Sequence, residues 1–269
     1  MKRSLRCLFL LMCLVASVSA HDLFLNLDTY FLRPNSRAIV RLMNGSFRTS
    51  EGAVGRERMR DVSFVAPDGS VAHPEANRWR DEGKTAILDL QTGATGTYVV
   101  AVSTKPREID LKAKDFNEYL AHDGLPDTFT MRRKNGELAK DIRERYSKHV
   151  RAIFQVGDTR TGSYRKPLGY PVEIIPQQHP YSLRLGQMLE VLCTLNGEPL
   201  VNQFVLAGFE SKAGSMSNEA SARTNARGIA RFRLSGVGKW YVKMIHMTKL
   251  QHADVDYESK WATLTFEIR

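Results

Sequence analysis

Cysteine is scarce in this sequence, with three among 269 residues, and two of these lie at positions 7 and 13. If the first twenty residues are removed, as argued below, Cys193 alone remains. A single cysteine excludes an internal disulfide and a thiolate zinc cluster. Cys193 lies in the strand-like run Leu189–Leu195, where a buried and inert thiol is expected.

Familiar catalytic and nucleotide-binding motifs are missing as well. The chain has no G-x-S-x-G, no H-E-x-x-H, no P-loop, no G-x-G-x-x-G after a strand and, beyond residue 20, no C-x-x-C. None of its seven histidines pair at the spacing of ligands on one helix face. We therefore predict that the protein is not an enzyme and that it has no nucleic-acid partner.

Long hydrophobic runs are absent after residue 20. Before it, three basic residues in Lys2–Arg6 precede the apolar run Cys7–Ala16, and Val18–Ala20 supply the small residues that a signal peptidase recognises. The apolar run is shorter than the roughly 20 residues of a membrane span. We predict that residues 1–20 are a signal peptide cleaved before His21. The product is then periplasmic or secreted, without a transmembrane segment.

Alternating hydrophobic residues and turn motifs dominate residues 21–104. Leu23–Leu27 has the period of two that is typical of a strand, and Ala38–Met43 is a second strand-like run, closed by Asn44-Gly45. Val62–Ala66 leads into the turn Pro67–Ser70. This pattern predicts an N-terminal antiparallel β-sandwich over residues 21–104.

The strand pattern returns over residues 169–269. Short strand-like segments, among them Met188–Leu195, Trp240–Met247 and Tyr257–Ile268, follow one another with glycine-containing turns between them. We predict a second β-sandwich here. The fold class is thus mainly β, with two antiparallel β-sandwich domains of immunoglobulin or transthyretin type.

Between the sandwiches, residues 105–168 are predicted to form a helical connecting segment. Apolar residues from Ala113 to Leu120 recur every three or four positions and stop at Gly124, which predicts a short helix. A similar spacing predicts a longer helix from about Asn135 to Phe154. The opposite face of this second helix is basic, with Lys140, Arg143, Arg145, Lys148 and Arg151. This face is either a solvated surface or a docking site for an anionic membrane or an acidic partner.

Cleavage before His21 would create a feature with metal-binding chemistry. The new α-amino group and the His21 imidazole can chelate one ion, and a further histidine would complete a three-nitrogen site for Ni, Co or Cu. His246, at the end of the strand-like run, is the candidate third ligand. Asp256 and Glu258 follow in a short segment and are candidate oxygen ligands or partners of His246. Alternatively, His21 has no ligand role and His246 is a buried structural residue.

Several segments together resemble a known family. They are His21–Leu25, Tyr146–His149, Phe154–Asp158, Pro167–Pro176, Pro180–Leu183, Gly238–Val242, Ile245–Met247 and Asp256–Glu267. The chain is similar to a bacterial exported family of uncharacterised domains that is labelled a nickel-uptake or cobalt-transport periplasmic component. The resemblance implies a β-rich, non-enzymatic periplasmic protein that handles a divalent metal, and it favours His21 and His246 as ligands. Some relatives have a histidine-rich loop at the position of 210–223, whereas this chain has no histidine there.

Two functions follow as hypotheses. In the first, the exported protein binds a divalent transition metal and passes it to a membrane metal transporter. In the second, it is a β-sandwich interaction module that recognises an envelope protein or a glycan without metal. In that case the basic helix would be the contact surface.

Overall fold

The computed structural model describes residues 21–251 and 254–269, so the predicted signal peptide lies outside the described residues. Its largest sheet has ten strands. The main path of this sheet, in spatial order, is β15 (Ala220–Arg223), β14 (Phe204–Ser211), β17 (Gly238–Lys249), β18 (Tyr257–Ile268), β10 (Ile142–Val156), β8 (Gly96–Thr104), β4 (Met59–Val65) and β5 (Val71–Ala72). The short strands β2 (Phe31–Leu32) and β9 (Arg107–Leu111) also pair with β10.

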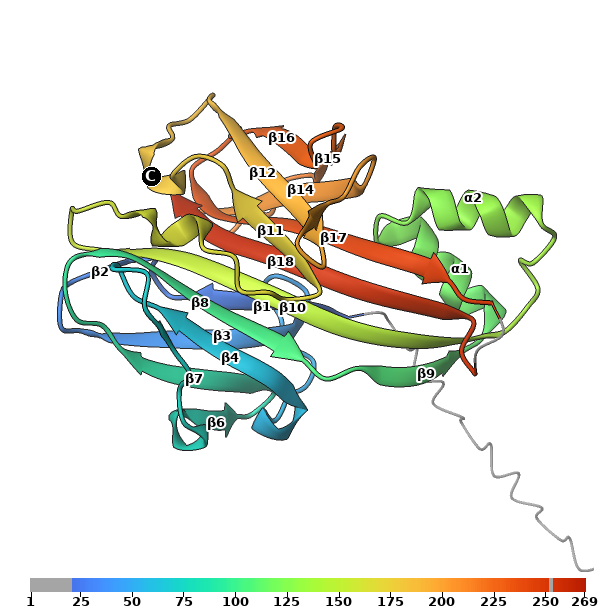
Figure 1. Cartoon of the computed structure of the whole chain (residues 1–269), viewed down its shortest axis with the longest axis horizontal. Helices are drawn as coiled ribbons and strands as arrows, with labels where there is room; N and C mark the ends of the chain where they lie inside the picture. The colour runs from blue at the N-terminus through green and yellow to red at the C-terminus, as the bar shows by residue number, and fades with distance from the viewer. Residues whose placement is uncertain (1–20, 252–253) are drawn as a thin grey trace, which may run out of the picture.

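Two four-stranded sheets flank the large sheet on opposite faces (Figure 1). One contains β1 (Asp22–Leu27), β3 (Arg37–Gly45), β7 (Thr85–Gln91) and β6 (Trp79–Glu82); the other contains β11 (Val172–Pro176), β12 (Met188–Leu195), β13 (Glu198–Pro199) and β16 (Ile229–Arg233). On β18, Thr263 and Thr265 donate hydrogen bonds to carbonyls of β1. On the neighbouring strand β10, Arg151 lies in register with Leu264 of β18 and forms an ion pair with Glu173 of β11, in the other small sheet. Because neighbouring residues of a strand point to opposite faces, the two small sheets lie on opposite sides of β18.

The mainly β, sandwich-like character predicted from the sequence is confirmed, and the long strand β10 links its two parts. β10 pairs antiparallel with β8 from the predicted N-terminal sandwich and parallel with β18 from the predicted C-terminal one. One continuous sheet therefore crosses the boundaries drawn at residues 104 and 169. The division into two domains of immunoglobulin or transthyretin type stays a prediction.

Two α-helices cover one end of the large sheet. The predicted short helix is confirmed as α1 (Ala113–His122), and it ends before Gly124, whose φ of +81° favours glycine. The second helix, α2 (Pro126–Lys134), was not predicted, although Pro126 stands at its first turn, a common position for proline. Short 3₁₀ helices occur at Arg56–Arg58, Ala76–Arg78, Gly162–Arg165 and Pro180–Ser182.

The predicted helix from Asn135 to Phe154 is wrong, because residues 142–156 form β10. Both faces of β10 are covered over most of its length, so the strand lacks the simple alternation of a half-exposed one. The predicted connecting segment 105–168 therefore combines α1 and α2 with two strands of the large sheet. Its basic residues do not form a helix face: Arg145 pairs with Glu108 at the surface, and Arg151 pairs with Glu173 in the interior.

A continuous hydrophobic core runs between the sheets. It includes Leu25 and Val40 from one small sheet, Val191 from the other, and Phe154 and Leu264 from the large sheet. A smaller cluster lies beneath α1, where the Tyr119 ring stacks on Trp261 at 5.5 Å between centroids. Cys193 is buried as predicted, and its burial raises the pKa of the thiol to about 12. Within residues 21–251 and 254–269, neither helix has the length and apolarity of a membrane span.

Candidate functional site

His21, the first described residue, lies beside two charged side chains and a cavity. Its side chain is 30% exposed, and its Nδ1 atom lies 3.5 Å from Oε2 of Glu51. Lys148 on β10 donates a hydrogen bond to the His21 carbonyl oxygen. His21 also lines a cavity of about 170 Å³ together with Lys148 and Trp261. An imidazole, a carboxylate and open space therefore meet at the predicted cleavage point.

Glu51 reaches His21 because the loop after β3 turns back sharply. The Glu51 N–H donates to the carbonyl of Asn44 at 2.8 Å, and Gly45 forms an isolated bridge with Ser50. A Cβ atom on Gly45 would lie 3.2 Å from Cγ of Glu51 and still closer to the main chain of the loop. Glycine at this position thus permits the return of the loop. The Asn44-Gly45 turn was predicted from the sequence, but no local pattern indicated that it places Glu51 beside His21.

His246 lies on the other side of the large sheet. Ile245, Trp261 and Lys148 stand in register on β17, β18 and β10, and His246 is the next residue after Ile245. Since side chains alternate between faces, His246 points away from the face on which Lys148 contacts His21. The structure does not bring the two predicted histidine ligands together.

Polar partners surround His246 on its own face. Its Nδ1 atom lies 3.1 Å from Oε1 of Gln203. Burial, followed by the positive charge of Lys260, lowers the pKa of His246, and the nearby Glu258 acts in the opposite direction. The Glu258 carboxylate forms an ion pair with Lys260. Glu258 therefore lies near His246, as predicted for a partner, but its carboxylate is paired with a lysine.

Asp256 is engaged elsewhere. One carboxylate oxygen lies 3.0 Å from Nζ of Lys140, and the other accepts a hydrogen bond from the Arg143 N–H at 2.9 Å. Burial by itself would raise the pKa of Asp256, but these two hydrogen bonds and the positive charges of Lys140 and Lys249 together lower the pKa below its usual value. In the described part of the chain, no cluster of three or more His, Cys, Asp or Glu side chains is arranged to hold a metal ion.

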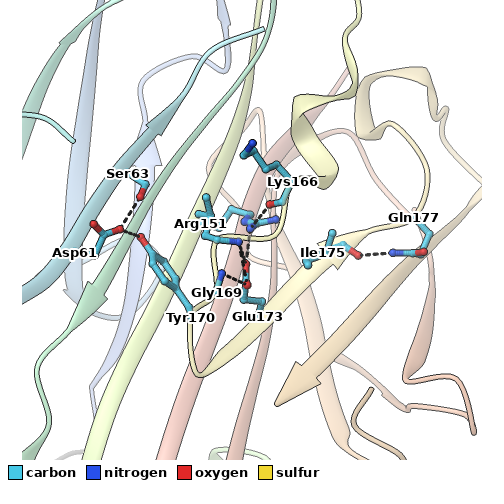
Figure 2. Close-up of polar contacts among 10 residues, drawn as sticks. Asp61, Ser63, Arg151, Lys166, Gly169, Tyr170, Glu173, Ile175 and Gln177 are labelled. Atoms are coloured by element: carbon cyan, nitrogen blue, oxygen red, sulfur yellow. Dashed lines mark hydrogen bonds and ion pairs between the residues drawn. The ribbon is translucent and has the colours of Figure 1, made fainter. Parts of the chain in front are cut away.

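Sequence reasoning missed a second polar site. It lies over the face of β8 and β10 that is opposite to the face where Lys148 contacts His21. Asp61 on β4 accepts hydrogen bonds from Ser63 and from the Tyr170 hydroxyl, both at 2.6 Å, and Figure 2 shows Tyr170 reaching it from the loop before β11. His73 lies 2.9 Å from the same carboxylate. These residues and Ser103 are among those that line a cavity of about 400 Å³.

His149 is buried behind this cavity between two serine hydroxyls. Ser103 Oγ lies 2.9 Å from Nδ1 and Ser147 Oγ lies 3.1 Å from Nε2. Burial, reinforced by neighbouring cations, lowers the pKa of His149 to about 3, so the imidazole is neutral at pH 7. A catalytic triad would place a carboxylate at the second nitrogen, and its serine would be accessible, whereas Ser103 is 1% exposed. We interpret this group as a structural link between β8 and β10.

Arg151 and Glu173 form a buried ion pair next to this group (Figure 2). Arg151 Nη2 lies 2.6 Å from Oε2 of Glu173 and also donates to the Lys166 carbonyl at 2.9 Å. The Glu173 carboxylate accepts from the N–H groups of Leu168 and Gly169 at 3.1 and 3.0 Å. The pair therefore holds the loop before β11 against the large sheet.

Comparison with known proteins identifies a family. A comparison with curated proteins finds no match. Among solved structures, the chain is similar to a tetra-tandem repeat in the extending region of a large adhesion protein, with 12% identity over 92% of this chain and a TM-score of 0.23. The aligned region of this chain covers 50% of the length of that structure. It is also similar to three N-terminal domains of the Highly Immunogenic Outer Capsid protein of bacteriophage RB49, with 6% identity, 93% of this chain and 100% of that chain covered, and a TM-score of 0.23. A family model described as "Domain of unknown function (DUF4198)" matches residues 18–248, which is most of the chain, and the protein therefore belongs to that family.

Proposed function

We propose that this protein is exported, is cleaved before His21, and binds one divalent transition-metal ion at its new N-terminus. The ligands are the α-amino group and imidazole of His21, with the Glu51 carboxylate in place of the His246 that the sequence suggested. The observation that carries the proposal is the 3.5 Å distance between the His21 imidazole and Glu51 at the margin of a cavity.

The donor chemistry favours Cu(II), Ni(II) or Co(II). An amine and an imidazole of one residue form a chelate, and nitrogen donors suit these metals better than Mg²⁺ or Ca²⁺. One ion then takes two nitrogens and one oxygen from the protein, which leaves positions for water or for a transfer partner. The nickel or cobalt label of the resembling family agrees with this donor set. Binding breaks no covalent bond, so the protein acts as a non-enzymatic carrier that delivers its ion to a membrane transporter.

Two features support a preformed position for His21. The carbonyl oxygen of His21 is held by Lys148. The next residue, Asp22, forms an ion pair with Lys243 at 2.8 Å, where both side chains are about one tenth exposed. These contacts anchor the backbone at the carbonyl of the chelating residue and at the residue after it, and less conformational entropy is then lost when the ion binds.

The test begins with the exported protein. Intact mass must show His21 as the first residue, and calorimetry with Cu(II), Ni(II) and Co(II) should then give one ion per chain. Acetylation of the N-terminus should abolish binding because it removes the amine, and Glu51→Gln should weaken it on the order of 10- to 100-fold. His246→Ala is the matched control and should bind normally. Equal affinity in the native, acetylated and Glu51→Gln forms would refute this site and favour an interaction module without metal.

A further inference from the structure

Lys148 is a buried cation that has no carboxylate in contact with it among the residues that the structure describes. It is 9% exposed, and its Nζ atom lies 5.1 Å from the centre of the Trp261 ring and 5.6 Å from that of Tyr146. Its ammonium group donates to the His21 carbonyl, which uses one of three donors. Among residues 21–251 and 254–269, no carboxylate lies within 4.0 Å of this nitrogen. A buried charge normally has such a partner, because desolvation is costly.

The nearest acids are already engaged with other groups. Asp22 lies 2.8 Å from Nζ of Lys243. Glu144, which is 3% exposed, accepts hydrogen bonds from Ser259 and from the Tyr119 hydroxyl. Burial has the largest effect on the pKa of Lys148 and lowers it to about 8, whereas the negative charges of Asp22 and Glu144 act to raise it. Within the described part of the chain, the acids near Lys148 are thus bonded to other groups.

Two cavities adjoin at Lys148, and they differ in character. Asn44, Tyr146 and Lys148 line both of them, and each measures about 170 Å³. The first, between α1 and β9, has an apolar wall made by Ile109, Leu111, Tyr119 and Trp261, and the carboxyl groups of Asp115 and Glu144 also line it. The second, beside the loop 53–58, is lined by Arg58 and Arg107 in addition to Lys148. A cationic chamber thus stands next to one with a large aromatic and aliphatic wall, called the apolar chamber below.

The cationic chamber has an excess of positive charge. Arg58 and Arg107 line the same cavity, and burial, followed by the charge of Arg107, lowers the pKa of Arg58. Of the described residues that line it, Glu57 alone is acidic, and its carboxylate is folded over Gly55. Arg58 makes a long hydrogen bond of 3.3 Å to the Lys105 carbonyl, so most of its donors remain available.

We propose that these adjoining cavities bind a small organic carboxylate. Its carboxylate group accepts hydrogen bonds from Lys148 Nζ and from the guanidinium groups of Arg58 and Arg107. Its carbon skeleton packs in the apolar chamber against Trp261. Charge-assisted hydrogen bonds in a partly buried site are strong, and the anion offsets the cost of burying Lys148. The apolar wall favours a carboxylate with a carbon skeleton over an inorganic oxyanion such as phosphate.

This site does not depend on the proposed metal. His21 lines the apolar chamber and positions Lys148 through its main-chain carbonyl, whereas the metal would be bound by its amine and imidazole. The experiment therefore uses metal-free protein, cleaved before His21 and dialysed free of chelator. Failure of metal binding leaves the carboxylate result unaffected, and failure of carboxylate binding leaves the metal result unaffected.

The probes are phenylacetate, its neutral analogue phenylacetamide, and inorganic phosphate, titrated by calorimetry into the full exported chain. We expect one molecule of phenylacetate to bind to each chain. Phenylacetamide and phosphate should each bind at least tenfold more weakly than phenylacetate. Lys148→Met should lower the affinity for phenylacetate at least tenfold. Arg58→Gln should lower it several-fold, and because Arg58 is only half-buried this variant tests the site even if Lys148→Met does not fold.

Arg133→Gln, which removes an exposed charge from α2, is the matched control and should bind like the native protein. The proposal is overturned if phenylacetate does not bind, if phenylacetamide binds equally well, or if Arg58→Gln and a folded Lys148→Met bind normally. Tighter binding of phosphate than of phenylacetate would also overturn it, because the apolar chamber would then have no role.

Discussion

Replacing Glu173 by glutamine should destabilise the protein strongly, because it leaves Arg151 as an uncompensated buried charge. Both side chains of this pair are 5% exposed, and their ion-pair distance is 2.6 Å. Breaking a buried ion pair by neutralising one partner costs about 3–5 kcal/mol. A domain has a total stability of roughly 5–15 kcal/mol, so Glu173→Gln would remove a large part of it. Urea unfolding at pH 7, followed by tryptophan fluorescence, gives the free-energy difference.

A second variant separates charge burial from the loss of hydrogen bonds to the loop. In Arg151→Met combined with Glu173→Gln, the glutamine oxygen still accepts from the main chain before β11, and the unpaired guanidinium is gone. Because an apolar group of similar size replaces the charge, we expect this double variant to recover about 2 kcal/mol or more relative to Glu173→Gln alone. Asp127→Asn is the control, because its ion pair with Arg223 is exposed and should contribute about 0–1 kcal/mol. The reasoning is refuted if Glu173→Gln costs no more than Asp127→Asn.

Two further predictions concern pH and backbone conformation. Burial and nearby cations lower the pKa of His149 to about 3, whereas the unfolded imidazole titrates near 6.5. Between about pH 3 and 6.5 the unfolded chain therefore binds more protons than the folded protein. The contribution of His149 to the free energy of unfolding is fully present above pH 6.5 and is lost at about 1.4 kcal/mol per pH unit as the pH falls toward 3. His149→Gln should flatten the fall of urea-unfolding stability between pH 6.5 and 4, and parallel curves for the two proteins would contradict this. Gly238 has a φ of +140°, and a Cβ there would collide with the main chain of β14, so Gly238→Ala should cost about 1–3 kcal/mol. Gly52→Ala, where no atom lies within 4 Å of the added carbon, should leave the thermal midpoint almost unchanged.

Local sequence patterns predicted several of the strands and the short helix. Leu23, Leu25 and Leu27 recur with a period of two because they pack in the main core, and that spacing is visible without any tertiary information. Phe24, between them, is also buried, in a separate cluster that the alternation did not indicate. Turn residues such as Asn196-Gly197 mark where strands end, since Asn196 and Gly197 both adopt positive φ. The helix α1 was predicted because its apolar spacing is interrupted at Gly124, where the chain needs a conformation that glycine adopts easily.

Tertiary structure decided what both faces of β10 contact and therefore how the site is built. A strand covered on both sides has no period of its own, and the apolar spacing from Leu138 to Ile153 resembled a helix by coincidence. Once β10 is a strand, Lys148 and Arg151 point to opposite faces, one beside His21 and the other to Glu173.

The same physical reason separates the predicted metal ligands. A sequence indicates which residues of one strand share a face. The relative orientation of His21 and His246, however, depends on how β1 packs against the large sheet. The sequence by itself determined the types of donor present, the strand-rich fold and the chemistry expected at a new N-terminus. Only the packing of distant strands brought Glu51 to His21 and placed a lysine without an anion in the cavity beside them.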